Sequence, residues 1–390
     1  MLDQRVVSER EDAQRRQAFP AGAAVTLADL EDAGHEHVLD ELREREPVTW
    51  LPALGGWLIT AREPARQILL PKSGATVEAE QNMVRASLGR MMLTVDGEEH
   101  ERYRQPFEVP FRARETERAF GTPIREFARE LVGRIDGERE LTQAFAAPFA
   151  VGVAAQVIGL PLNDVHRIDG FYAAFAAAME YTGDPEPLQR ADAARSELTE
   201  LLLEGLTRSK VVEASDLTPD EVAAQLRVVM FGAIETIQAS VLTTLMLLLQ
   251  HPQAMAEVRH DPSLLTGAVD EAIRLMPPVA FMERWTQRPV TLAGVEIGDR
   301  EFIGVSVIAA NRDPSVFEDP LRFDIHRHNS RHGLSFSSGE HHCLGVHLAR
   351  MQTVIALEEM LAAWTSIELV SVTAPSGFAF RRPADLVVRV

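Results

Sequence analysis

The chain has 390 residues, of which 46% are hydrophobic and 25% are charged, values typical of a globular protein and not of a fibrous or disordered one. Its 58 acidic and 39 basic side chains give a formal net charge of -19. Such an acidic surface repels the phosphates of nucleic acids and of anionic lipids, so neither is an expected partner.

The first twenty residues alternate acidic and basic side chains, and we interpret them as a mobile arm before a single domain over residues 21–390. They lack the apolar segment of a signal peptide, and we expect no apolar run to be long enough to span a bilayer. The one cysteine, Cys343, excludes an intramolecular disulfide. We therefore expect a cytoplasmic protein that does not enter a membrane.

The first third of the chain predicts one helix and one hairpin before a long helical region. A helix is expected over about Leu27–Arg43, and a β-hairpin over Val48–Leu51 and Gly56–Thr60. From about residue 61 to residue 267 the pattern is mostly helical, with breaks at Pro and Gly clusters such as Thr182–Pro185.

The clearest element begins at Thr218. Thr218 and Glu221 have the spacing of a capping box, and Pro219 is suited to the first helical position. No strong stop follows until His251-Pro252, which predicts a helix of roughly thirty residues, or about 50 Å. Because most of its surface is apolar, this helix should pass through the core.

The C-terminal third contains the predicted strands. Short strands are expected at Val290–Leu292 and Val295–Ile297, and a longer β-type run at Phe302–Ala310. An irregular stretch then extends from residue 311 to 339, a second helix runs from just after Cys343 to about Trp364, and the tail is strand-like. The fold class predicted is therefore mainly α with a small β portion.

Cys343 is the residue with the most chemistry to offer. A loop of small residues brings it to the start of a helix, where N–H groups and the macrodipole stabilise a thiolate. A thiolate is the form that binds iron. Gly339 and Gly345 would let the backbone lie close to a flat macrocycle.

Three other interpretations of this cysteine stay open at the level of the residues alone. A single cysteine is most often a buried structural residue. Clustering with His341 and His342 also suggests zinc, although a structural zinc site needs four ligands. The third is a Cys/His nucleophile, for which adjacency in the sequence is weak support.

The loop resembles the F-x-x-G-x-H-x-C-x-G motif of the cytochrome P-450 family, through Phe336, Gly339, His341, Cys343 and Gly345. The resemblance implies the P-450 fold, with the long central helix over a buried haem b. It also implies that Cys343 is the axial ligand of the iron and that His341 bonds a haem propionate. Ser337 stands where many members have Gly.

Other segments resemble the same family and extend the expected haem site. His100 and Arg104 match its H-x-x-x-R pair, and Arg284 matches a further arginine; the resemblance implies that all three bind haem propionates. Glu271 and Arg274 match its E-x-x-R helix, with Arg327 as the matching meander arginine. For Glu271, Arg274 and Arg327 we expect a structural role.

The long helix contains Ala233, Glu235 and Thr236, which resemble the family's [A/G]-G-x-[D/E]-T motif. The resemblance implies that Glu235 relays protons and that Thr236 hydrogen-bonds bound oxygen, so both are expected catalytic residues. A threonine inside a helix also commonly bonds back to the carbonyl four residues earlier. Ala233 replaces the usual second glycine, and its methyl group narrows the expected oxygen pocket.

The function implied by the resemblance is that of a haem-thiolate monooxygenase, which uses O2 to hydroxylate or epoxidise a small apolar or amphipathic molecule. No CxxC or flavin motif is present, so electrons would come from a separate ferredoxin or flavodoxin and its reductase. Their candidate docking residues, which are equally well explained as ordinary surface arginines, are Arg102, Arg112, Arg114 and Arg350. The expected substrate-pocket residues are Met230, Ala233, Val279, Phe281 and Phe378.

The alternatives are a peroxide-driven or non-oxygenating haem-thiolate enzyme and, in a different class, a haem sensor or carrier without catalysis. A sensor or carrier does not need an acid and an alcohol beside the iron. A zinc protein is the remaining alternative.

Overall fold

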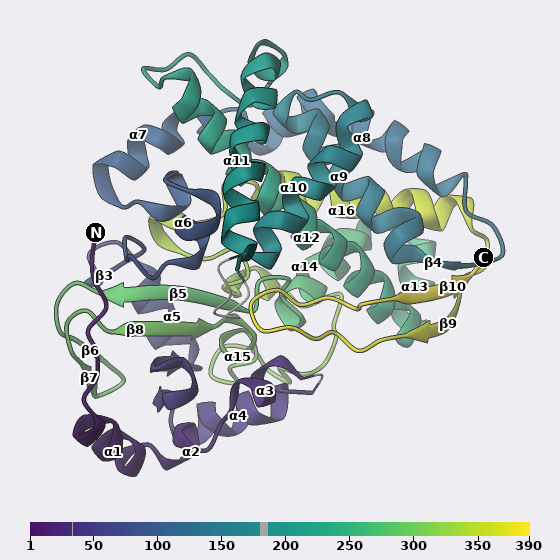
Figure 1. The fold of residues 1–390 in the computed structure, drawn as a ribbon. Helices are drawn as coiled ribbons and strands as arrows, with labels where there is room; N and C mark the ends of the chain where they lie inside the picture. Colours follow the sequence, from purple (N-terminus) through teal and green to yellow (C-terminus); the bar gives the residue numbers. More distant parts are fainter. Residues whose placement is uncertain (33, 180–185) are drawn as a thin grey trace. The chain divides into compact units, whose positions relative to one another are not determined.

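The computed structural model describes residues 1–32, 34–179 and 186–390, so the predicted break at Thr182–Pro185 lies outside the described residues. Helices dominate the fold and strands are few (Figure 1). The chain forms two compact units. Unit 1 comprises Met1–Ala79, Leu242–Cys343 and Leu369–Leu386, and unit 2 comprises Glu80–Val241, Leu344–Glu368 and Val387–Val390.

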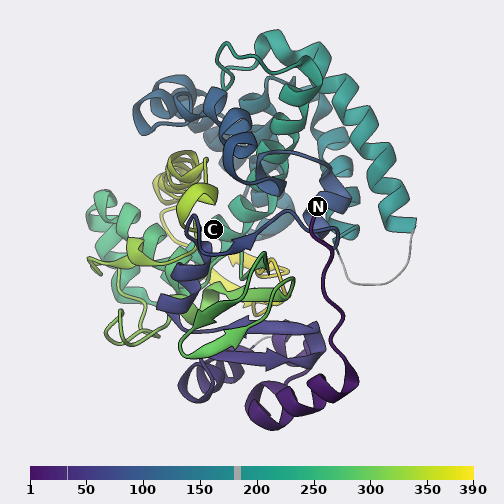
Figure 2. The same ribbon diagram turned by 90° about the vertical axis from the view of Figure 1, so that its left-hand side faces the viewer.

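Unit 1 is built on a five-stranded sheet in the order β1-β2-β8-β5-β3. Its strands are β1 (Val48–Leu51), β2 (Gly56–Ile59), β3 (Ala75–Thr76), β5 (Phe281–Thr286) and β8 (Phe302–Ser306). The predicted hairpin is confirmed, since β1 and β2 pair antiparallel. β8 runs parallel to β2 and antiparallel to β5, so the C-terminal third of the chain completes a sheet that the N-terminal segment begins (Figure 2).

Unit 1 also contains helices and short strands that precede, separate and follow the strands of this sheet along the chain. The helices are α1 (Glu9–Ala18), α2 (Pro20–Ala23), α3 (Leu27–Glu31), α4 (Glu36–Arg45), α5 (Arg62–Leu69), α13 (Pro252–His260), α14 (Leu265–Leu275) and α15 (Val307–Asn311). The predicted strands at 290–292 and 295–297 are confirmed as the antiparallel pair β6 (Val290–Leu292) and β7 (Val295–Ile297).

Two predicted boundaries in unit 1 are wrong. The helix expected over Leu27–Arg43 is two helices, because α3 ends at Glu31 and the following Asp32 has an extended ψ of 153°. The β-type run from Phe302 ends at Ser306, whose hydroxyl accepts a hydrogen bond from the N–H of Ala309 and caps α15. Apolar β-branched residues alone do not separate a buried strand from a short buried helix.

The N-terminal segment has a specific place on unit 1. Arg15 of α1 forms an ion pair of 2.7 Å with the buried Glu301, and its guanidinium lies 4.5 Å from the ring centre of Trp50 and 5.0 Å from that of Trp57. These contacts hold α1 against the sheet through charge and cation–π attraction. The mobility of the first twenty residues stays a prediction, as does the boundary at residue 21.

Unit 2 is mainly helical. Its helices are α6 (Met83–Leu88), α7 (Gly97–Glu108), α8 (Ala113–Val132), α9 (Ala147–Ile158), α10 (Val165–Ala177), α11 (Glu186–Gly205) and α16 (Val346–Ala363). Strand β4 (Glu138–Glu140) pairs antiparallel with β10 (Leu386–Arg389). Strand β9 (Glu368–Val372) belongs to unit 1 except for Glu368. Helix α16 packs along α8, where Arg125 and Arg129 form ion pairs with Glu359.

The predicted long helix is α12 (Pro219–Gln250), of 32 residues, which passes from unit 2 into unit 1 at Leu242. Its predicted capping box is confirmed, since the N–H of Thr218 donates to Glu221 at 2.8 Å and the N–H of Glu221 donates to the Thr218 hydroxyl at 3.3 Å. By length and composition α12 is long and apolar enough to cross a membrane, contrary to expectation. However, 72% of its most apolar window is buried, as in the core helix of a globular protein.

Candidate functional site

The loop that contains Cys343 is closed by its own backbone. The N–H of Cys343 donates to the carbonyl of Phe336 at 2.8 Å, and the N–H of Ser337 donates to the carbonyl of Leu334 at 2.8 Å. Cys343 is half-buried in unit 1, two residues before Gly345, the N-cap of α16. The backbone therefore fixes the position from which the sulfur is presented.

Two residues of this loop have left-handed backbone conformations. Ser337 has a φ of 61° and Gly339 a φ of 73°. A side chain is strained at such values, which explains why glycine suits the position of Ser337. At Gly339 glycine is required, because an added Cβ would lie 2.5 Å from the carbonyl oxygen of Leu69.

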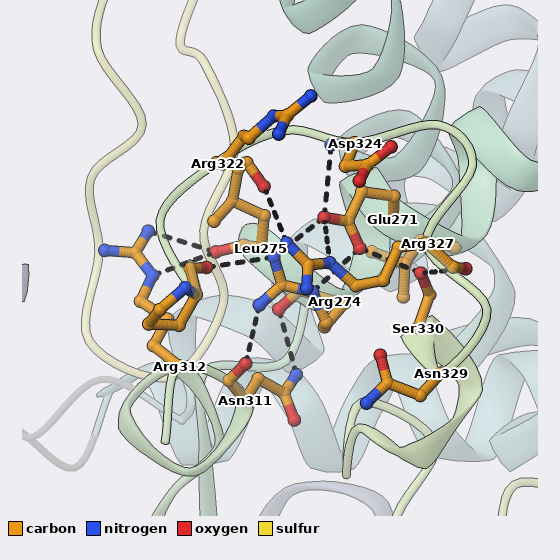
Figure 3. A network of polar contacts seen from close by, with 12 residues as sticks. Glu271, Arg274, Leu275, Asn311, Arg312, Arg322, Asp324, Arg327, Asn329 and Ser330 are labelled. Atoms are coloured by element: carbon orange, nitrogen blue, oxygen red, sulfur yellow. Dashed lines mark hydrogen bonds and ion pairs between the residues drawn. The ribbon is translucent and has the colours of Figure 1, made fainter. Parts of the chain in front are cut away.

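Glu271 on α14 is the centre of a buried ion cluster in unit 1 (Figure 3). Arg274 donates to both of its carboxylate oxygens at 2.8 Å, and Arg327 donates to one of them at 2.8 Å. The hydroxyl of Ser330 donates to the other oxygen at 2.8 Å. The contact expected between Arg327 and the E-x-x-R helix is thus present, while the structural role of the three residues stays a prediction.

Asn311 connects this cluster to the start of the cysteine loop. Its carbonyl oxygen accepts a hydrogen bond from Arg274 at 2.7 Å, and its side-chain amide donates to the backbone carbonyl of Arg274 at 3.1 Å. The side-chain oxygen of Asn311 accepts from the N–H of Leu334 at 2.6 Å. Sequence reasoning missed this residue, because an asparagine before a turn is common and only the fold shows its partners.

The other predicted residues of unit 1 lie on or beside β5. Arg284 is 8% exposed and donates to the carbonyl of Glu283 at 2.7 Å. The rings of Phe281 and Phe378 are 4.4 Å apart, and Val279 forms a β-bridge with Phe380. Phe281 and Phe378 are therefore brought together by the fold as an apolar pair.

The predicted propionate residues of unit 2 lie on α7. His100 is buried, with 4% of its surface exposed, and Arg104 lies four residues further along the same helix. Four residues correspond to about one helical turn, so the two side chains share one face. Arg104 also forms an ion pair of 3.5 Å with Glu108.

The centre of α12 is accessible although both of its flanks are buried. Gly232 is exposed and Ala233, Glu235 and Thr236 are half-buried, whereas residues 222–228 and 237–248 are buried. An added Cβ at Gly232 would meet nothing within 4 Å. The hydroxyl of Thr236 donates to the carbonyl of Gly232 at 2.6 Å, so the helix-internal bond weighed for this threonine is present.

Tyr172 on α10 holds the carboxylate of Glu235. Its hydroxyl donates to Glu235 Oε2 at 2.9 Å, and its ring lies 5.5 Å from that of Phe231. Nothing in the sequence pointed to Tyr172. Met230, in contrast, is 0% exposed, so this predicted pocket residue is packed in the core of unit 2 and presents no surface to a ligand.

The predicted docking arginines of unit 2 differ in their surroundings. Arg102 forms ion pairs with Glu221 at 2.8 Å and Asp216 at 3.3 Å, which raise the pKa of the Arg102 guanidinium and balance its charge. Arg112 and Arg114 are exposed. Arg102 is thus a poor candidate for docking an acidic partner, and Arg112 and Arg114 are better ones.

Each unit offers features that suit a haem. Unit 1 presents a sulfur on a glycine-containing loop, and an added Cβ at Gly345 in unit 2 would meet nothing within 4 Å. The accessible Gly232 segment of α12 likewise leaves backbone open to a flat ligand. Among the described residues, no candidate metal cluster contains Cys343, which counts against zinc.

Comparison with known proteins identifies the class. The cytochrome P450 family model matches residues 165–370. Cytochrome P450 107B1 of Saccharopolyspora erythraea is 30% identical, covering 83% of this chain and 86% of that protein. The mycinamicin IV hydroxylase/epoxidase of Micromonospora griseorubida is 30% identical, covering 89% and 94%.

Solved structures agree. The crystal structure of P450BioI in complex with hexadec-9Z-enoic acid ligated acyl carrier protein has a TM-score of 0.83 and 27% identity, covering 92% of this chain and 98% of that one. The fold and the relatives define a haem-dependent monooxygenase. The chain belongs to the cytochrome P450 family, which confirms the predicted family, fold class and enzyme class.

Proposed function

We propose that this chain is a cytoplasmic, haem b-dependent monooxygenase. It hydroxylates or epoxidises an apolar or amphipathic small molecule with O2, using electrons from a separate ferredoxin or flavodoxin and its reductase. The observation that carries this proposal is the accessible segment of α12, where an acid and an alcohol lie in an otherwise buried helix. A carboxylate on an apolar helix is stable only where it keeps polar contacts, so the position of Glu235 in the accessible segment favours a functional role.

The chain's own residues would hold the haem at defined atoms. The sulfur of Cys343 would bind the haem iron, and His100, Arg104, Arg284 and His341 would bind the propionates through charge-assisted hydrogen bonds. When bound, a thiolate-ligated haem supplies the chemistry of oxygen activation by favouring O–O cleavage. The Glu271 cluster and Asn311 would keep the cysteine loop in place.

Glu235 and Thr236 would control the protons. Because the hydroxyl hydrogen of Thr236 is donated to the carbonyl of Gly232, its lone pairs are available to accept a hydrogen bond from a water. Glu235, held by Tyr172 at 2.9 Å, would exchange protons with solvent and pass them to that water. Thr236 in this arrangement orients the proton donor.

The substrate pocket would be apolar. Its proposed lining residues in unit 1 are Val279 and the aromatic pair of Phe281 and Phe378. Ala233 stays a predicted pocket residue, whereas Met230 is fully buried. The names of relatives include 6-deoxyerythronolide B hydroxylase and 20-oxo-5-O-mycaminosyltylactone 23-monooxygenase. These names support a large molecule with much apolar surface as the substrate class.

The proposal is tested by Thr236→Ala with Thr236→Ser as the matched control. Electrons are supplied by a surrogate ferredoxin and reductase, and the hydrogen peroxide released per electron pair is measured. Loss of the hydroxyl should raise this fraction several-fold, roughly up to tenfold, whereas serine should preserve the wild-type value. Equal fractions in all three proteins would mean that another group controls the protons, as in a peroxide-driven enzyme.

A further inference from the structure

Arg227 on α12 is a buried cation in unit 2. Arg227 lies within the buried stretch Val222–Val228 and is itself 5% exposed. The Nε of Arg227 is buried and has no hydrogen-bond partner, and among the described residues no carboxylate forms an ion pair with its guanidinium. Buried arginines are normally paired, so a buried Arg227 with an unpartnered Nε requires an explanation.

A second arginine lies beside it. Burial and the charge of Arg195 on α11 lower the pKa of Arg227 to about 10, so the side chain is still protonated at neutral pH. Arg195 forms an ion pair of 2.5 Å with Asp192 and approaches the carbonyl of Ser87, the last but one residue of α6, at 3.4 Å. The two guanidiniums therefore repel each other, and among the described residues the ion pair of Asp192 is made with Arg195.

We propose that Arg227, with Arg195 beside it, binds an oxyanion, a carboxylate or a phosphate, at the polar end of an otherwise apolar substrate. The inference rests on the proposed function and narrows its substrate class from apolar or amphipathic molecules to anionic amphiphiles. A guanidinium presents several N–H donors in one plane and matches the oxygens of carboxylate or phosphate. A bound oxyanion would also supply the negative charge that balances the guanidinium of Arg227.

The position of Arg227 on α12 supports a substrate anchor. Arg227, Phe231 and Glu235 are spaced four residues apart, so they form one shallow stripe along the helix. Glu235 lies eight positions after Arg227, which corresponds to about 12 Å along the helix axis. An anionic group at Arg227 would place a chain of that length along the apolar ring of Phe231, with its far end at the acid of the accessible segment.

The experiment measures binding to the purified holoenzyme by titration calorimetry. The probes are dodecanoate and dodecyl phosphate, with 1-dodecanol as the neutral analogue. Wild-type protein should bind one or both anions at least about tenfold more tightly than dodecanol, since a charge-assisted pair is broken by neutralising the ligand. Arg227→Gln should abolish this preference while changing the Kd for dodecanol less than about twofold.

Two further variants make the test specific. Arg227→Lys keeps the charge but not the planar donors, and should retain part of the preference. Arg190→Gln is the matched control, because Arg190 is on the same helix as Arg195 and its side chain is 62% exposed. The preference of Arg190→Gln for anions should equal that of wild type.

Preference for dodecanoate would identify a free acid as the source of the oxyanion, and preference for dodecyl phosphate would identify a phosphorylated substrate; either supports the site. Equal binding of the anions and dodecanol by wild type would overturn the inference, as would an unchanged preference in Arg227→Gln. Calorimetry does not depend on the haem spectrum, which tests the proposed function through the red-shifted Soret band that a thiolate-ligated haem gives in its ferrous carbon monoxide complex. A normal spectrum without anion preference defeats this inference alone, and anion preference without that spectrum defeats the proposed function alone.

Discussion

Two buried arginines, Arg274 in unit 1 and Arg227 in unit 2, have opposite surroundings. The side chain of Arg274 is 0% exposed, bonds both oxygens of Glu271 at 2.8 Å, and lies 5.0 Å over the ring of Phe317. Its Nη1 also donates to the carbonyl of Asn311 at 2.7 Å. Arg227 is 5% exposed and has a buried Nε with no partner.

The difference separates a charge used for folding from a charge kept for a ligand. Arg274 makes two hydrogen bonds to the carboxylate of Glu271 and two to backbone carbonyls, so four of its five N–H donors are used inside the protein and it organises the residues around it. The Nε–H donor of Arg227 stays available for a ligand, although burying the charge of this side chain without a partner disfavours folding. The following predictions examine each side of this comparison.

The largest effect is expected for Glu271→Gln. The substitution removes the carboxylate that both Arg274 and Arg327 contact, and leaving buried cations without a counter-charge costs about 3–5 kcal/mol of the free energy of unfolding. Denaturant unfolding of the holoenzyme measures it. Glu257→Gln, which alters an exposed pair with His326, is the control and should change the free energy by less than about 1 kcal/mol. An equally small loss in Glu271→Gln would contradict the interpretation that Arg274 and Arg327 depend on Glu271 for their counter-charge.

A smaller loss is expected for Asn311→Ala. Asn311 is 0% exposed, and its side chain joins Arg274 to the N–H of Leu334 at the start of the cysteine loop. Leaving these buried groups unpaired should cost about 1–3 kcal/mol and lower the haem content of the purified protein. Asn329→Ala, which removes a bond to Val316 elsewhere in the coil, should lower stability without lowering haem content. Full haem content in Asn311→Ala would show that the connection is not needed.

Arg227→Met should instead raise the free energy of unfolding. Burial and the charge of Arg195 lower the pKa of Arg227 to about 10 in the folded state, so above this pH the unfolded state binds more protons than the folded state does. The destabilisation is therefore fully present below pH 10 and decreases as the pH rises above it. Its upper limit is about 3 kcal/mol, and lost packing offsets part of this, so a net gain of about 1 kcal/mol at neutral pH is expected. Denaturant unfolding without added anions measures it, and a loss of stability would mean that Arg227 has an internal partner.

The elements that could be predicted from the sequence are those set by local patterns. The capping box at Thr218 and the apolar length after it are enough to predict α12, and the short apolar runs on either side of Ala293 and Gly294 predict β6 and β7. The division between α3 and α4, and the start of α15 at Val307, depend on tertiary packing of short apolar segments. Such boundaries are not encoded in a local repeat.

The candidate site shows the same division. The spacing of short motifs predicts Cys343, Glu271 and Glu235 as site residues, because each motif is formed together with their neighbours in the sequence. It could not distinguish Met230, which is fully buried, from the accessible Ala233 three residues later. Arg227 was missed because a single arginine in a helix is normally at the surface, and only burial and missing partners reveal it.

The most direct test of the account is the spectrum of the ferrous carbon monoxide complex, recorded for wild type, Cys343→Ala and His342→Ala. His342 is exposed next to Cys343 and is the matched control. Wild type and His342→Ala should show the red-shifted Soret band of a thiolate-ligated haem, and Cys343→Ala should lose it. A wild-type preparation without haem, or the same red-shifted band in Cys343→Ala, would contradict the assignment of this sulfur as the iron ligand.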